Sequence, residues 1–345
     1  MKLITTQADL SHALRTIAPA ISNSNSHPIL SCCLVAASGG TMTVTGFNLE
    51  LGITVRVPAA VDTAGTVALP YRLLAGLVSR MDDGEPVTLS DGAVSASSGS
   101  YGLAVQDAAD YPALPVVEAP SAELDLTAGV RACMAAVSTD VSKAILQGIH
   151  LADGVMESTD GHRLMRVPVS LPDGIDLVLP ASTMKLLQDR TVGIAAARGQ
   201  AVIDAGDGIT IYSRILDGKY PNVAALIPAS FEHTITLDRH RFTRCLERVA
   251  LIAEAHNSVV KLTAGKQLVI TAEADANNGK ETIAYEGTAK GSWAFNVHYL
   301  LDGLKAMRSA DTVTLSANSA TTPVIVRPAD SIDMTYLVMP VQVRE

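Results

Sequence analysis

Six stretches of the chain carry apolar residues at the three-to-four-residue spacing of an amphipathic helix. Residues 7–17 are an example, because Leu10, Leu14 and Ile17 would share one helix face. Two of the later stretches open with a proline, which suits the first turn of a helix. The six predicted helices fall into three pairs, which cover residues 7–17 and 70–78, 126–134 and 180–187, and 238–249 and 297–304.

Between these helices, short runs of alternating polar and apolar residues predict strands. Examples are residues 41–46, 234–237 and 267–271. Each third of the chain then closes on a segment that runs into a proline, at Pro112, Pro221 and Pro340. These prolines lie 109 and 119 residues apart, so the repeat is about the size of a domain.

The repeated order of elements predicts an α+β protein of three similar domains. We expect the domains to span residues 1–118, 119–233 and 234–345. The chain shows neither the regular strand–helix alternation of a parallel sheet nor a phosphate-binding loop.

The composition suits this plan, because 48% of the 345 residues are apolar and can fill large cores. No apolar run is long enough to span a membrane, and the first residues do not resemble a signal peptide. The four cysteines, Cys32, Cys33, Cys133 and Cys245, show neither a disulfide framework nor metal-ligand spacing. We therefore expect small buried side chains, no metal, no cofactor and a cytoplasmic protein.

The net charge of -9 argues against a general nucleic-acid-binding protein, and the four Phe and one Trp disfavour base stacking. The distribution of charge changes this picture. When the six predicted helices are extended to the segments 8–21, 71–81, 126–138, 182–190, 238–252 and 297–308, they together carry 12 basic and 5 acidic residues, whereas the rest of the chain carries 14 basic and 30 acidic. Basic helices could face a polyanion. Alternatively, Lys and Arg are simply good helix formers, while Asp prefers turns.

Five motifs in order along the chain resemble those of the bacterial DNA polymerase III beta subunit family, the bacterial sliding clamps. Residues 159–164, TDGHRL, are similar to a family signature of the same letters, and residues 336–341, YLVMPV, resemble its YVVMPM ending. The other matches are PIL at residues 28–30, TGFNLE at 45–50 and FNVHYLLD at 295–302. Because they run from near the start to near the end, the resemblance covers the whole chain.

The resemblance implies a head-to-tail homodimer of three-domain protomers, a ring with inner helices and outer sheets. Such a clamp encircles double-stranded DNA and confers processivity on the replicative DNA polymerase; it is not an enzyme. The family also implies a peptide pocket that takes short motifs from polymerase, clamp loader and repair proteins. Carried over residue by residue, the pocket would use Leu146, Thr159, Gly161, His162, Arg163, Leu164, Pro221, Leu226, Tyr299, Pro323, Val324, Leu337, Val338, Met339, Pro340 and Val341.

The resemblance also implies a protomer interface and a DNA-contacting surface. At the interface, Tyr101 and Leu103 would meet Leu251 and Ile252 of the partner subunit. Arg72 matches a DNA-contacting position of the family, and the other helix-borne candidates come from the charge pattern. The full DNA-binding set is Arg72, Arg15, Arg80, Arg131, Lys185, Arg241 and Arg244.

The chain departs from the family pattern at several positions. An acidic residue of the family falls on Asn48, and basic residues of the pocket region fall on Ala225 and Gln342. A DNA-contacting arginine falls on Ser24. Two aromatic positions fall on Ala144 and Ile145. These changes leave DNA contact and partner preference open.

The Asp160 and His162 pair could suggest catalysis, but no nucleophile or metal set accompanies it. A turn with a packed histidine, or a pocket wall, explains the same residues. For Tyr299 the core and the pocket remain equal alternatives. For the whole chain the second hypothesis is a three-domain scaffold that binds peptides without encircling DNA.

Overall fold

The computed structural model describes residues 1–23, 27–117, 121–127, 129–255, 257–330 and 333–342. These form two compact units, one of residues 1–124 and 191–215 and one of residues 125–190 and 216–345. The division of the chain into three domains stays a prediction. The α+β class is confirmed, because each unit combines two antiparallel sheets with helices.

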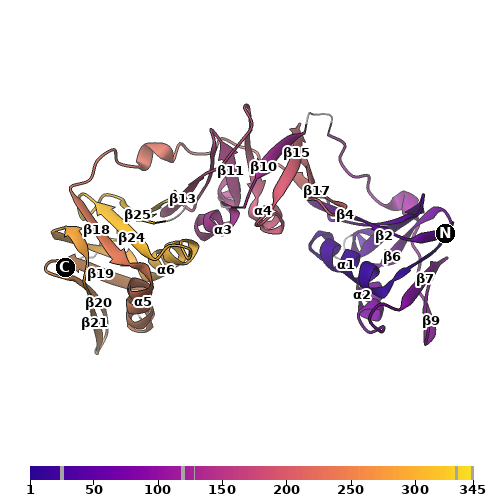
Figure 1. Ribbon diagram of the computed structural model, residues 1–345, viewed down its shortest axis with the longest axis horizontal. Coiled ribbons are helices and arrows are strands. Elements are labelled where there is room, and N and C mark those ends of the chain that lie inside the picture. The colour runs from indigo at the N-terminus through magenta and orange to yellow at the C-terminus, as the bar shows by residue number, and fades with distance from the viewer. Residues whose placement is uncertain (24–26, 118–120, 128, 256, 331–332, 343–345) are drawn as a thin grey trace. The chain divides into compact units, whose positions relative to one another are not determined.

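In unit 1 a five-stranded sheet has the order β5-β1-β7-β8-β9, and an eight-stranded sheet has the order β10-β15-β16-β17-β4-β3-β2-β6. Helices α1 and α2 contact each other and lie side by side against the strands (Figure 1). The helices are α1 (Gln7–Ile17) and α2 (Tyr71–Val78). The strands are β1 (Lys2–Thr6), β2 (Cys32–Ser38), β3 (Thr41–Phe47), β4 (Leu51–Pro58), β5 (Ala60–Thr63), β6 (Gly65–Pro70), β7 (Pro86–Ser90), β8 (Ala93–Ala96), β9 (Gly99–Gly102), β10 (Ala122–Asp125), β15 (Thr191–Ala197), β16 (Gln200–Asp204) and β17 (Ile209–Arg214).

In unit 2 a nine-stranded sheet has the order β14-β11-β12-β13-β26-β25-β24-β18-β22, and a four-stranded sheet has the order β21-β20-β19-β23. The helices are α3 (Val130–Cys133), α4 (Ala181–Leu186), α5 (Arg239–Ala253) and α6 (Val297–Ala306). The strands are β11 (Gly148–Ala152), β12 (Val155–Thr159), β13 (Arg163–Pro168), β14 (Asp176–Pro180), β18 (His233–Asp238), β19 (Val259–Ala264), β20 (Leu268–Ala274), β21 (Asn277–Ile283), β22 (Glu286–Thr288), β23 (Gly291–Asn296), β24 (Thr312–Ala317), β25 (Val324–Pro328) and β26 (Thr335–Val338).

A strand that runs directly into a helix recurs in both units. At three of these junctions the last strand residue caps the helix with its side chain: Thr6 accepts from Asp9 N, Asp238 from Arg241 N and Asn296 from His298 N. Such caps satisfy amide groups that a helix leaves unpaired at its start. At α2 and α4 the proline that the sequence placed in the first helical turn is instead the residue just before the helix.

The predicted helix over residues 126–138 is wrong for most of its length. Only Val130–Cys133 is α-helical, followed by one 3-10 turn at Met134–Ala136. Asp125 holds Thr127 in a turn by accepting from its amide and its hydroxyl, and Gly129 is a poor helix former. The predicted ends at residues 81 and 190 are also too late, since α2 ends at Val78 and α4 at Leu186.

All four cysteines are buried and free, as expected. Burial raises the pKa of the Cys33 thiol to about 12, so this side chain stays protonated near neutral pH. No helix in the described part of the chain is long and apolar enough to cross a membrane.

Candidate functional site

A tight turn between β12 and β13 carries the TDGHRL motif. The Asp160 carboxylate accepts hydrogen bonds from the amides of His162 (2.9 Å) and Arg163 (3.1 Å). Gly161 lies at φ +94°, a conformation that favours glycine. Asp160 thus binds the His162 backbone and not its ring, which fits the turn interpretation of this motif.

Arg163 ties this turn to helix α6. Its side chain is 13% exposed, donates to Asp160 Oδ2 at 2.9 Å and donates to Asp302 Oδ2 at 2.7 Å. The guanidinium also lies over the Tyr299 ring, 4.5 Å from its centre. Burial disfavours the charged form, but the bond to Asp302 and the other polar neighbours outweigh it and raise the pKa of Arg163.

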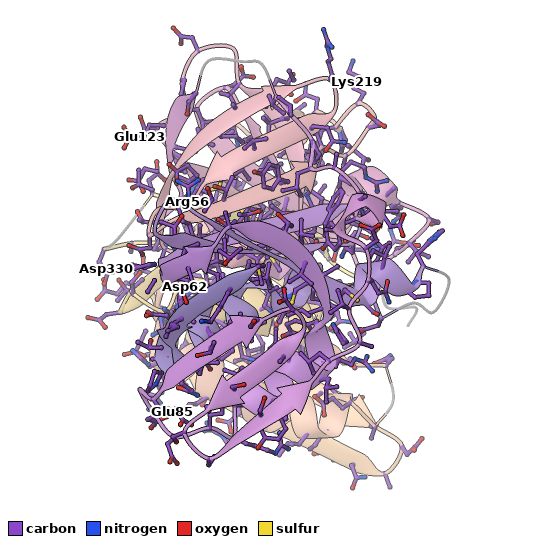
Figure 2. All side chains as sticks on the ribbon, turned by 90° about the vertical axis from the view of Figure 1, so that its right-hand side faces the viewer. Arg56, Asp62, Glu85, Glu123, Lys219 and Asp330 are labelled. Carbon is purple, nitrogen blue, oxygen red and sulfur yellow. The ribbon has the colours of Figure 1, made fainter. Side chains whose placement is uncertain are left out.

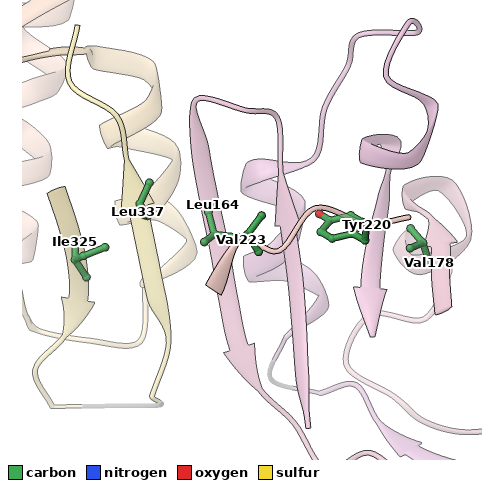
Figure 3. Close-up of a cluster of buried hydrophobic side chains, with 6 residues drawn as sticks. All are labelled: Leu164, Val178, Tyr220, Val223, Ile325 and Leu337. Atoms are coloured by element: carbon green, nitrogen blue, oxygen red, sulfur yellow. The ribbon is translucent and has the colours of Figure 1, made fainter. Parts of the chain in front are cut away.

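The opposite face of the sheet holds an apolar cluster beneath residues 216–231. Figure 3 shows its six buried side chains in a row across the strands. Ile145, Leu146, Leu216, Ile227, Phe231 and Met339 are partly buried against this row. The buried members are Leu164, Val178, Tyr220, Val223, Ile325 and Leu337.

Several expected pocket residues form an accessible rim near this cluster. Leu226 is 54% exposed in the 3-10 turn Ala224–Leu226, and Pro221 is exposed just before it. Met339 donates its amide hydrogen to His162 O at 2.9 Å, which brings the chain end beside the turn. Val341 and Pro340 continue from there, and Val341 N donates to Ala294 O.

Not all sixteen expected residues lie on one face. Arg163, Val338 and Val324 are cross-strand partners, so they share the face toward α6, whereas Leu164 and Leu337 share the other. Val324 and Val338 are fully buried there. Tyr299 is half-buried beside Arg163, and Thr159 bonds Arg163 O and Gly161 N within the turn. Pro323 is half-buried just before β25.

Sequence reasoning missed Tyr220, Val223, Val178 and Ile325, which complete the apolar row. Tyr220 lies directly before the predicted pocket residue Pro221, so its position in the sequence could have identified it as a member of the site. The other three fall on separate strands or on the covering segment, and only the register brings them together.

The observed helices remain basic, with nine basic and three acidic residues in α1 to α6. Arg15 and Arg72 are exposed on unit 1, and Lys185, Arg241 and Arg244 on unit 2. None of these five forms an ion pair with a described residue. Figure 2 labels four acidic residues on strands and loops, Asp62, Glu85, Glu123 and Asp330, together with the basic Arg56 and Lys219.

Four other basic side chains have internal partners. Arg80 lies beyond the end of α2 and donates to Gly76 O, and Arg131 pairs with Asp189. Arg239 is buried and bonds Ala310 O, while Arg248 binds Glu281. Of the cluster on α5, this leaves Arg241 and Arg244 available to a ligand. Ser24 lies outside the described residues.

The expected interface residues lie in two places, on and next to edge strand β9 and on helix α5. Tyr101 belongs to β9, the edge strand of the five-stranded sheet, and is 41% exposed. Leu103 is buried within its own unit. Leu251 on α5 is 75% exposed, and Ile252 is half-buried near Gly279 of edge strand β21.

Comparisons with known proteins agree along the chain. Residues 1–115 match the DNA polymerase III beta subunit N-terminal domain, and residues 224–342 match the C-terminal domain of the same subunit. A beta sliding clamp of Synechococcus elongatus is 34% identical over 100% of both chains, and one of Synechocystis is 35% identical over 99% of both.

Solved structures show the same fold. The sliding clamp of Bacillus subtilis superposes with a TM-score of 0.91 at 23% identity and covers 100% of both chains. A Pseudomonas aeruginosa sliding clamp, solved bound to griselimycin, has a TM-score of 0.89 at 22% identity and covers 99% of this chain and 100% of its own. By these matches, the chain belongs to the DNA polymerase III beta subunit family, the bacterial beta sliding clamps.

Proposed function

We propose that the chain encircles double-stranded DNA as a homodimeric ring of three-domain protomers and gives the replicative polymerase its processivity. The observation that carries this proposal is the separation of charge. The helices hold nine basic and three acidic residues in a chain whose net charge is -9. Phosphate contacts from such helices hold DNA without reading its sequence, which suits sliding.

The DNA-contacting set is an inference from exposure and charge. Arg15, Arg72, Lys185, Arg241 and Arg244 are the stronger members, because they have no ion-pair partner among the described residues. Arg131 and Arg80 already have internal partners, and DNA would compete with those contacts. Ala144 and Ile145 stand where the family has aromatic residues, so this chain relies more on its cations.

The edge strands support a head-to-tail interface. Edge strand β9 carries Tyr101, and edge strand β21 lies beside Ile252 of α5, whose exposed neighbour on that helix is Leu251. An uncovered edge with exposed apolar side chains is a ready site for pairing with a second copy. A dimer that joins two different patches in this way closes into a ring only if the geometry fits.

Light scattering tests the dimer. We expect a mass of two 36.0 kDa chains at micromolar concentration. Leu251→Glu places a charge in the proposed interface and should shift the protein to monomers, by about 2 kcal/mol or more of association free energy. Val116→Glu, at another largely exposed apolar residue, is the matched control and should stay dimeric. A monomeric wild-type protein would rule out the ring.

We further propose that the surface around Leu164, Leu226, Met339 and the turn at residues 159–163 is a peptide pocket for polymerase, clamp loader and other clamp-motif proteins. An apolar floor with a few fixed polar groups suits an anchored peptide. Griselimycin is the probe of choice, and we expect it to bind here. Loss of binding in Leu226→Asp, measured by calorimetry, would locate the site.

The proposed role needs neither catalysis nor a cofactor, since a ring holds DNA by topology and a pocket holds peptides by contact. It places the protein in the cytoplasm, where replication takes place in bacteria.

A further inference from the structure

A polar row crosses the nine-stranded sheet beneath the segment that carries Pro221. His150 on β11 pairs with Glu157 on β12, and Glu157 pairs with Arg166 on β13, so the three side chains share one face. His150 Nδ1 lies 2.9 Å from Glu157 Oε1, and Nε2 lies 3.0 Å from Asp176 Oδ1 on β14. Arg166 Nε lies 3.4 Å from Glu157 Oε2.

Tyr220 stacks on this histidine. The two ring centres are 4.5 Å apart and the planes are inclined by 24°. The buried Tyr220 hydroxyl has no hydrogen-bond partner of good geometry among the described residues. The ring, drawn in Figure 3 between Val178 and Val223, is therefore positioned mainly by the stacking on His150 and by apolar contacts.

Because His150 lies between two carboxylates, its protonation state decides how many hydrogen bonds its ring can donate to them. A neutral imidazole has one donor and one lone pair, whereas the protonated ring donates from both nitrogens. Because each nitrogen faces a carboxylate oxygen, only the cation satisfies both. The cation also attracts the face of the Tyr220 ring.

The charged and titratable groups facing His150 are Glu157 on β12, Asp176 on β14, Tyr220 above it and Arg166 through Glu157. Burial alone would lower the pKa of His150, but the hydrogen bonds to Glu157 and Asp176 outweigh it and raise this pKa. Burial raises the pKa of Tyr220, so the phenol stays neutral. Since the folded pKa of His150 is raised, its stabilisation is complete below about pH 6.5 and is lost as the pH rises through the folded value.

We propose that His150 is a positioning residue of the peptide pocket: its protonated ring holds Tyr220, and with it the adjoining Pro221–Val223 wall, in the geometry that binds ligand. This role rests on the proposed function of the pocket. After deprotonation one nitrogen lone pair faces a carboxylate, and Asp176, whose side chain is 81% exposed, can turn into solvent. The imidazole then tilts, and the wall loses its support.

Griselimycin binding to the whole chain, measured by calorimetry at about pH 6 and about pH 8.5, tests this role. We expect the dissociation constant of the wild-type protein to rise about threefold over this range. His150→Gln cannot titrate, and we expect it to lose this rise. His162 lies at the pocket in both proteins, so the difference between them reports on His150.

Two further variants sharpen the test. His240→Gln is the matched control, because His240 also lies near a carboxylate, 3.9 Å from Asp311, but is exposed. It should keep the wild-type rise. Asp176→Asn removes the exposed carboxylate partner of His150 without disturbing the core. The rise of the dissociation constant should then occur at lower pH. Because Asp176→Asn should fold even if His150→Gln does not, the role can be tested in either case.

A merely structural role would lower the thermal midpoint of His150→Gln but leave its pH response equal to that of the wild type, and that result would overturn the proposal. A wild-type affinity that is the same at both pH values would overturn it too, while leaving the pocket intact. Absence of griselimycin binding at either pH would contradict the pocket itself and the positioning role with it.

Discussion

Gly303→Ala is expected to lower the free energy of unfolding of unit 2 by about 2 kcal/mol or more. A Cβ atom at Gly303 on α6 would lie 2.5 Å from Cδ1 of Tyr336 and closer still to Cε1 of the same ring. The Tyr336 ring is buried, and its hydroxyl donates to Tyr299 O at 2.7 Å. The ring cannot turn aside without losing this hydrogen bond, so helix α6 and strand β26 must move apart.

Gly76→Ala is the matched control, since Gly76 is also a helical glycine. The nearest atom to a methyl group at this position would be Arg80 Nη1, at an ordinary 3.7 Å. Here the better helix propensity of alanine should stabilise the protein by about 0.5–1 kcal/mol. Urea unfolding followed by circular dichroism measures both variants, and the fluorescence of Trp293, the only tryptophan of the chain, reports on unit 2. Equal midpoints for the two variants would contradict the packing described for Gly303.

Arg163→Ala is expected to cost about 2 kcal/mol of stability, because it leaves two carboxylates near each other without their cation. This loss of stability is smaller than for a fully buried ion pair, because Asp302 is 40% exposed and solvent partly screens its charge. We also expect griselimycin affinity to fall about tenfold, because the turn at residues 159–163 and Tyr299 lose a shared contact.

Arg214→Ala provides the comparison for an ordinary surface pair. Arg214 lies 3.4 Å from Glu50, and both side chains are more than half exposed. Its loss should change stability by no more than about 0.5 kcal/mol. A double-mutant cycle of Arg163 and Asp302 measures the coupling directly, and a coupling near zero would show that the contact does not hold the turn.

The sequence predicted local structure well wherever a pattern was long or a cap was present. Helices over residues 7–17 and 238–249 match α1 and α5 closely, because both show clear apolar faces after capping residues. The helix over residues 126–138 failed, since Thr127 and Gly129 favour a turn that Asp125 stabilises. Neither the spacing of the apolar residues nor the charge pattern indicated this turn.

The candidate site could be predicted only in part, because its residues come together through strand register. The TDGHRL turn and the chain end were visible as motifs. The pairing of β13 with β26 places Leu164 opposite Leu337 across more than 170 residues, and nothing local encodes that. His150, Glu157 and Arg166 likewise lie on three different strands, and only the register brings them together.

Retention on circular DNA tests most directly whether this chain encloses DNA. After loading by a clamp loader onto a nicked circle, the protein should co-elute with the DNA and leave it when the circle is cut to a linear form. Neutralising Arg241 and Arg244 should weaken contact without abolishing retention, since topology holds the ring. Equal retention on circular and linear DNA, or none on either, would contradict the account and favour a peptide-binding scaffold that does not encircle DNA.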